Sequence, residues 1–140
     1  KHRKFTRTFP QVGGAIYFSA KDVKADRRKT TTRLVNRYYS RPAIAPGYGT
    51  PTTAMPQAPT NIRDRNGQIT WSTSDPNVVN YAIYQVPTTT PTDCAFIDAR
   101  HLTAVIPANA TNQWSAPPNG EKVFISAVDR WGRESQRRSP

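Results

Sequence analysis

The stretch that decides the fold is residues 119–135, NGEKVFISAVDRWGRES, near the C-terminal end of the 140-residue chain. It opens with Asn-Gly, a dipeptide that accepts the left-handed backbone of tight turns. The residues that follow alternate between two faces, with Val123, Ile125 and Ala127 on one face and Phe124, Ser126 and Val128 on the other. The alternation stops at DRWG, residues 129–132, a second turn. Turn, strand and turn in this order predict one strand of a small antiparallel sandwich.

Other short strands precede and follow this stretch at the spacing of a sandwich. Asn66-Gly67 is a hairpin turn between a predicted edge strand at residues 58–62 and a strand at 68–72. Residues 79–86 (VNYAIYQV) alternate again, with Tyr81 and Ile83 on one face and Ala82 and Tyr84 on the other. Further strands are predicted at residues 94–97, 102–106 and 134–139, and a loop that carries Trp114 at 109–118. The predicted fold class is mainly β, an antiparallel β-sandwich.

The N-terminal part of the chain is basic, and the C-terminal part is not. Twelve Lys and Arg residues against two acids precede Ala58, and eight against seven follow, so net charges of +10 and +1 make up the total of +11. Residues 15–18 form a short apolar run of the kind found in strands covered on both faces, and residues 21–39 are predicted to be helical up to Arg41-Pro42. Residues 43–57, rich in Pro, Gly and Thr, are a linker or an irregular packed strap. We therefore divide the chain into a basic segment, residues 1–57, and a sandwich, residues 58–140.

The strand segments carry a family resemblance. The runs APTNI, GQITWS, NYAIYQV and NGEKVFISAVDRWGRES resemble a fibronectin type III domain of the kind appended to bacterial secreted hydrolases. The resemblance implies an immunoglobulin-like antiparallel sandwich, in which Trp71 is the buried tryptophan of the second strand and Tyr81 the aromatic residue of the third. The chain departs from the family at Val123 and Phe124, where many members have a tyrosine.

The basic segment carries a second resemblance. VGGAIYFSAKDV, a helix and YYSRPAIAP are similar to the C-terminal end of glycosyl-hydrolase-like family 10 proteins, which are exported or lipid-anchored bacterial proteins with a (β/α)8 barrel. The resemblance implies that residues 15–18 are the last barrel strand and residues 30–39 the last barrel helix, with the rest of the barrel upstream. Ser19 and Lys21 would then lie at the rim of the parent active site. It also implies a periplasmic, cell-surface or extracellular location, with the upstream barrel as the partner of the sandwich.

Catalytic residues are not expected in this chain. Glycoside hydrolysis needs two carboxylates that flank the sugar bond, whereas Asp22 and Asp26 stand alone among basic residues. His2 and His101 lie far apart in the sequence, and Cys94 lacks a partnered histidine. We therefore expect no enzyme activity, no metal ion and no cofactor. No apolar run approaches the roughly 20 residues of a membrane-spanning helix, and we expect a monomer.

Two groups of side chains are candidates for ligand contact. The rings of Tyr84, Trp114 and Trp131 are predicted on an outer face or in loops, where they could stack on a polysaccharide. The alternative is that Trp131 covers the end of the sandwich and that Trp114 packs under its own loop. The basic residues of the first part could contact nucleic-acid phosphates or form the solvated face of the last barrel helix, which we favour because no nucleic-acid motif accompanies them. These residues are Arg27, Arg28, Lys29, Arg33, Arg37 and Arg41, with Tyr38 and Tyr39 beside them.

The two resemblances, with no catalytic carboxylate pair expected, thus imply a non-catalytic accessory module of a bacterial secreted glycoside-hydrolase-like protein. The module packs on or spaces the catalytic barrel and has weak contact with carbohydrate. Two alternatives stay open. One is a basic module that binds nucleic acid or another polyanion, and the other is a protein–protein adaptor.

Overall fold

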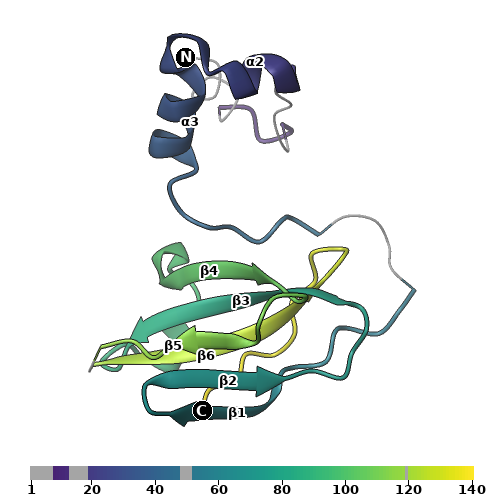
Figure 1. Ribbon diagram of the computed structural model, residues 1–140, viewed down its shortest axis with the longest axis vertical. Helices are drawn as coiled ribbons and strands as arrows, with labels where there is room; N and C mark the ends of the chain where they lie inside the picture. Colours follow the sequence, from purple (N-terminus) through teal and green to yellow (C-terminus); the bar gives the residue numbers. More distant parts are fainter. Residues whose placement is uncertain (1–7, 13–18, 48–51, 119) are drawn as a thin grey trace. The chain divides into compact units, whose positions relative to one another are not determined.

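The computed structural model describes residues 8–12, 19–47, 52–118 and 120–140. The chain divides into two compact units, Lys1–Ser40 and Arg41–Pro140, and its described residues are mainly β (Figure 1). The strand predicted at residues 15–18 and the side chain of His2 lie outside the described residues.

The described part of the first unit is helical. Helices α2 (Ala20–Ala25) and α3 (Thr30–Tyr38) are separated by a 3-10 turn, η1 (Arg27–Lys29). The single helix predicted over residues 21–39 is therefore wrong in its middle. The break has a local cause, because Asp26 adopts a left-handed conformation and its carboxylate accepts hydrogen bonds from the amides of Thr31 and Thr32, which lie in the first turn of α3. The predicted end is confirmed, since α3 stops before Arg41-Pro42.

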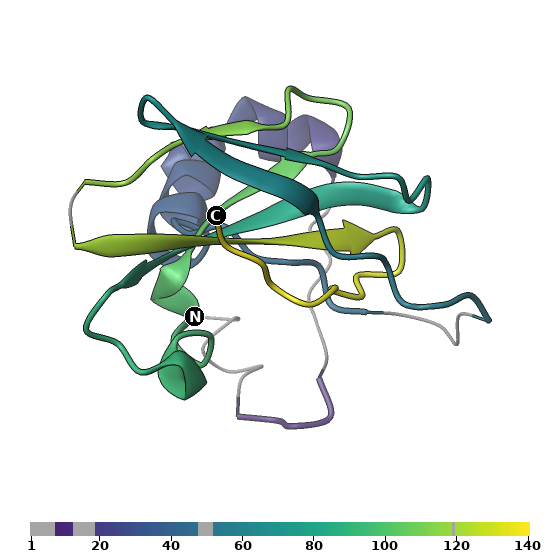
Figure 2. The ribbon, with the colours of Figure 1, turned by 90° about the horizontal axis from the view of Figure 1, so that it is seen from below.

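The described residues of the second unit form two antiparallel sheets of three strands each. The first sheet has the order β1-β2-β5 and contains β1 (Thr60–Arg65), β2 (Gln68–Ser72) and β5 (Gln113–Ser115). The second has the order β4-β3-β6 and contains β4 (Leu102–Pro107), β3 (Val78–Pro87) and β6 (Glu121–Asp129). In Figure 1 the β1–β2 hairpin lies below the layer of β3, β4 and β6, and Figure 2 shows the unit from below. This arrangement agrees with the predicted sandwich-like class.

Turn chemistry places several of these strands where the sequence predicts them. Asn66 and Gly67 both have positive φ values, 52° and 76°, so the predicted hairpin turn between β1 and β2 is confirmed. The longest pairing joins β3 to β6, from Val78 opposite Asp129 to Pro87 opposite Glu121. The last strand predicted at residues 134–139 is reduced to two isolated bridges to β6, Glu134 opposite Val128 and Arg138 opposite Ile125, and the backbone of Arg138 exchanges hydrogen bonds with Ile125.

The core between the sheets is built around two aromatic residues. Trp71 on β2 is 5% exposed and Tyr81 on β3 is fully buried, and their rings meet edge to face with centroids 5.3 Å apart. The face predicted from the alternation of β6 joins them with Val123, Ile125 and Ala127. Trp114 lies opposite Ile69 in the pairing of β2 with β5 and packs against the same core. The predicted loop around Trp114 is therefore wrong, because residues 113–115 form a short strand.

The outer face of the second sheet is also covered, which the sequence does not predict. Tyr84, Ala82 and Val128 form a second buried cluster with Ala95, and partly buried Phe96 packs against it. The strand predicted at residues 94–97 is wrong, since the chain forms a 3-10 turn, η2 (Thr92–Cys94), followed by a further turn. These two turns and η3 (Ala99–His101) fold segment 92–101 back over the sheet.

Candidate functional site

The segment before β1 packs on the sandwich. We call its described residues, 41–47 and 52–57, the strap. Ile44 packs against the buried cluster on the outer face of the second sheet, and Pro56 is buried. The second compact unit begins at Arg41, whereas the sequence places the boundary after residue 57. In its described residues this Pro- and Gly-rich segment is therefore a packed strap and belongs to the unit of the sandwich.

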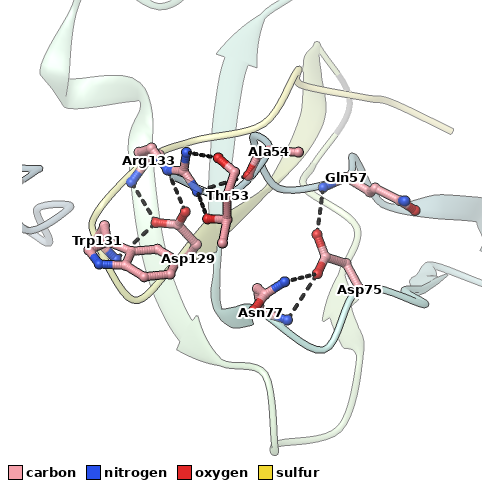
Figure 3. Close-up of polar contacts among 8 residues, drawn as sticks. All are labelled: Thr53, Ala54, Gln57, Asp75, Asn77, Asp129, Trp131 and Arg133. Carbon is pink, nitrogen blue, oxygen red and sulfur yellow. Dashed lines mark hydrogen bonds and ion pairs between the residues drawn. The ribbon is translucent and has the colours of Figure 1, made fainter. Parts of the chain in front are cut away.

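Arg133, in the turn after β6, holds the strap with its whole guanidinium group (Figure 3). Nη1 donates a hydrogen bond to the carbonyl of Thr53 at 2.8 Å, and Nη2 donates to the carbonyl of Ala54 at 2.8 Å and to Oγ1 of Thr53 at 2.9 Å. Nε donates to the carboxylate of Asp129 at 2.7 Å. One side chain thus ties two strap residues to the end of a core strand.

Asp129 is the buried anchor of this arrangement, at 2% exposure. Its Oδ1 accepts hydrogen bonds from the backbone amides of Trp131 and Arg133, both at 2.9 Å. Burial alone would raise the pKa of Asp129, but the hydrogen bonds from the amide and the guanidinium of Arg133 outweigh burial and hold that pKa below its usual value. The carboxylate is therefore charged at neutral pH and fixes the turn that carries Arg133.

A second carboxylate, Asp75, holds the end of the strap (Figure 3). It accepts a hydrogen bond from the amide of Gln57 at 3.0 Å, and from the amide and side chain of Asn77 at 2.9 and 3.1 Å. The amide of Gln57 is the largest cause that lowers the pKa of Asp75, followed by the amide of Asn77. The strap is thus fixed at residues 53, 54 and 57 by groups from two different loops.

Acid is expected to loosen the strap. The pKa values of Asp75 and Asp129 are lower in the folded chain than in the unfolded chain. The two carboxylates therefore stabilise the fold fully above the unfolded-state pKa of about 4. This stabilisation is lost as the pH falls through the pKa values of the folded chain. Urea unfolding at pH 7 and at pH 3 measures the loss. Between the two pH values, the free energy of unfolding should fall less in the variant Asp75→Asn than in the native chain. Equal losses would mean that Asp75 is not charged and bonded as described.

Gly132 allows the strap to approach the turn after β6. Its φ is +78°, and a Cβ atom there would lie 2.5 Å from the carbonyl oxygen of Ala45 and 3.0 Å from the amide nitrogen of Gly47. Gly67 has nearly the same φ, +76°, but a Cβ atom there would meet nothing within 4 Å. Substituting each glycine by alanine therefore distinguishes two effects: backbone strain occurs at both positions, and a clash with the strap occurs only at Gly132.

We expect Gly67→Ala to cost roughly 1–2 kcal/mol of unfolding free energy, from the left-handed backbone alone. Gly132→Ala should cost more, and should also speed hydrogen exchange at the strap amides, because the new methyl group pushes against the strap backbone. The measurement is urea unfolding together with hydrogen exchange. If both variants lost the same unfolding free energy and hydrogen exchange at the strap amides did not change, the strap would not contact Gly132.

The three predicted sugar-stacking rings lie in different places. Tyr84 is on the outer face of its sheet as predicted, but it is only 6% exposed, and its hydroxyl donates a 2.7 Å hydrogen bond to Oε1 of Glu134. Burial raises the pKa of Tyr84 to about 12. Trp114 faces the core between the sheets. Half-buried Trp131 lies in the turn after β6, with the guanidinium groups of Arg130 and Arg133 5.7 and 5.2 Å from its ring centroid.

Stacking on a sugar needs an open ring face, so the structure does not present Tyr84 for this role. Arg137 lies over the ring at 5.0 Å, and Phe96 packs against it edge to face at 5.4 Å. The sequence placed Tyr84 on the correct face of its strand, but alternation does not indicate which residues cover that face. The backbone of Trp131 lies close to the strap, since its carbonyl oxygen would be 3.2 Å from a Cβ atom on Gly47.

The remaining candidates lie in the first unit or in loops. Ser19 precedes α2 and donates a hydrogen bond to Asp22 at 3.2 Å, and Lys21 is exposed on α2. The cationic side chains of η1 and α3 are exposed, and the three ion pairs among the described residues all belong to the second unit: Arg100–Asp98, Arg133–Asp129 and Arg137–Glu134. The ring of His101 contacts the carbonyl of Ala95 at 2.6 Å. No cluster suited to a metal ion occurs among the described residues.

No family model, no curated protein and no solved structure matches this chain. In the part of the chain that the structure describes, the helices are too short and too polar to cross a membrane.

Proposed function

We propose that this chain is a non-catalytic accessory module of a bacterial secreted glycoside-hydrolase-like protein, in which a fibronectin type III-like sandwich packs on or spaces an upstream catalytic barrel. The observation that carries the proposal is the docked strap. An accessory domain can position its neighbour only if the segment that joins them is fixed. Here the segment before β1 is held by Arg133 and Asp75 and is packed through Ile44.

The strand connections support the fibronectin type III-like assignment. The chain forms a hairpin in one sheet, crosses to the other sheet for β3 and β4, returns beside β2 as β5, and crosses again beside β3 as β6. Such crossings are the Greek-key connections of immunoglobulin-like sandwiches. The edge-to-face contact of Trp71 with Tyr81 is at the positions that the resemblance implies.

The use of the carboxylates supports a non-catalytic role. Asp129, Asp98 and Glu134 each form an ion pair with an arginine two to four residues away, and Asp75 accepts a hydrogen bond from the amide of Gln57, the last residue of the strap. A glycosidase needs one carboxyl group that acts as an acid and another that acts as a base or nucleophile across a shared substrate space. Three of these four carboxylates are neutralised by an arginine close to them in the chain, which favours a structural role for them.

Pulsed electron paramagnetic resonance on the full chain tests the proposal. The single cysteine, Cys94, is exposed, and Met55 in the strap is 56% exposed, so Met55→Cys supplies a second label site. We expect a narrow distribution of label distances, which Arg133→Ala should broaden. A broad distribution in the chain with Arg133 intact would show a free linker, and the spacing role would be lost.

The polyanion-binding alternative keeps one observation in its favour. The exposed basic residues of η1 and α3, such as Arg28, Arg33 and Arg37, are outside the ion pairs found among the described residues. Duplex DNA binding measured from about 50 to 200 mM salt decides between the two functions, because each phosphate contact adds to the salt slope. At the highest salt concentration of this range we expect no binding of duplex DNA to the chain. Tight binding with a steep slope would favour the alternative.

A further inference from the structure

A shallow groove lies on the outer face of the first sheet, away from the strap contacts. Its volume is 670 Å³, and its lining comes from β1, β2 and the turn between them. The lining residues are Asn61, Arg63, Arg65, Asn66, Gln68, Thr70 and Ser72. Every one carries an amide, a hydroxyl or a guanidinium group.

Strand pairing arranges these side chains in ordered rows. Arg63 lies opposite Thr70, and Thr70 lies opposite Gln113. Arg65 lies opposite Gln68, and Gln68 lies opposite Ser115. Each row therefore runs from an arginine on the edge strand across two uncharged polar side chains. The two arginines are about 6–7 Å apart along β1, because they are separated by one residue.

The charge of this face has no carboxylate partner among the described residues. Four other arginines of the sandwich are engaged elsewhere: Arg100, Arg133 and Arg137 in ion pairs, and Arg130 over the ring of Trp131. Arg63 and Arg65 form neither kind of contact with any residue that the structure describes. Charges on an edge strand also discourage pairing with other chains, but that role does not account for the polar rows that continue over β2 and β5.

We propose that this groove binds an acidic polysaccharide. The guanidinium groups of Arg63 and Arg65 pair with carboxylates on the sugar units, for which a planar guanidinium is the best-matched cation. The amide and hydroxyl side chains beside them exchange hydrogen bonds with sugar hydroxyl groups. This inference adds a binding site to the module and does not depend on the spacing role or on an upstream barrel.

The lining favours an acidic glycan over other polyanions. Proteins that bind single-stranded nucleic acid without sequence preference combine basic grooves with aromatic side chains that stack on the bases, and the lining of this groove contains no aromatic residue. An acidic peptide supplies carboxylates but few hydroxyl groups for the amides of Asn61, Asn66 and Gln68. A carboxylated, hydroxyl-rich chain is complementary to both kinds of lining side chain.

The test is an amide-resolved NMR titration of the full chain with a galacturonate oligosaccharide. Salt at about 0.15 M screens the long-range attraction between the acidic oligosaccharide and the basic first unit. We expect shifts at β1 and β2 amides, and no response there to a neutral xylose oligosaccharide. In the double variant Arg63→Gln/Arg65→Gln, affinity read at these amides should fall about tenfold or more, because two charge-assisted contacts are lost.

The matched control is Lys122→Gln/Arg138→Gln, which removes the same charge from exposed positions outside the groove. It should bind as the native chain does. The proposal is overturned if both double variants lose affinity equally, or if shifts are confined to residues 20–38. Equal binding of a poly-glutamate peptide or a single-stranded DNA oligonucleotide at the same amides would overturn the choice of a glycan.

Discussion

Trp71→Ala is expected to lower the free energy of unfolding of the sandwich by about 3–5 kcal/mol. The indole is 5% exposed and meets Tyr81 edge to face in the core between the sheets. Truncation removes apolar contacts from both sheets at once and leaves a cavity between them. Because small domains are stable by only about 5–15 kcal/mol, such a loss is a large share of the total.

Urea unfolding followed by circular dichroism measures this loss, with Ile97→Ala as the control. Ile97 is 81% exposed, so its truncation should change stability by no more than about 0.5 kcal/mol. If the two variants were equally stable, Trp71 would not lie in the core that joins the sheets.

Arg133→Ala is expected to cost about 3–5 kcal/mol, because it leaves the Asp129 carboxylate buried without its cation. The same change removes the guanidinium hydrogen bonds to Thr53 and Ala54. We therefore expect a second effect beyond stability. Hydrogen exchange of strap amides should accelerate even under conditions where the sheets stay folded.

The matched control for this prediction is Arg130→Ala. Arg130 also lies over the Trp131 ring, at 5.7 Å, but it is exposed and forms no ion pair among the described residues. Its loss should cost about 0.5–1 kcal/mol. If Arg130→Ala matched Arg133→Ala in both readouts, the effect would come from the ring contact and not from the ion pair.

Local chemistry made much of the sandwich predictable. Asn66-Gly67 specifies a hairpin turn by its tolerance of positive φ, and the alternation of β6 identifies the inward-facing residues correctly. What failed depended on distant segments. Ala95 and Phe96 occur in a loop rich in Thr and Pro, and nothing nearby in the sequence indicates that they cover the outer face of another strand. Tyr84 was taken for an exposed ring for the same reason.

Sequence patterns could not predict the contacts of the strap. Arg133 and Asp129 are spaced so that an ion pair can be expected, but the strap carbonyls that Arg133 also binds belong to residues about 80 positions earlier. Short elements were missed as well, since three residues of β5 give too little alternation to read. The helix breaks at Asp26 because its side chain accepts hydrogen bonds from the first turn of α3. The spacing of apolar residues does not indicate such a break.

The strap is a fixed part of the sandwich unit. The most direct measurement is the backbone heteronuclear NOE of the full chain, residue by residue, for positions 41–47 and 52–57 compared with β3 and β6. We predict values in the strap, including the Gln57 amide bound by Asp75, that equal those of the two core strands. Low values throughout the strap, beside high values in the strands, would contradict the account.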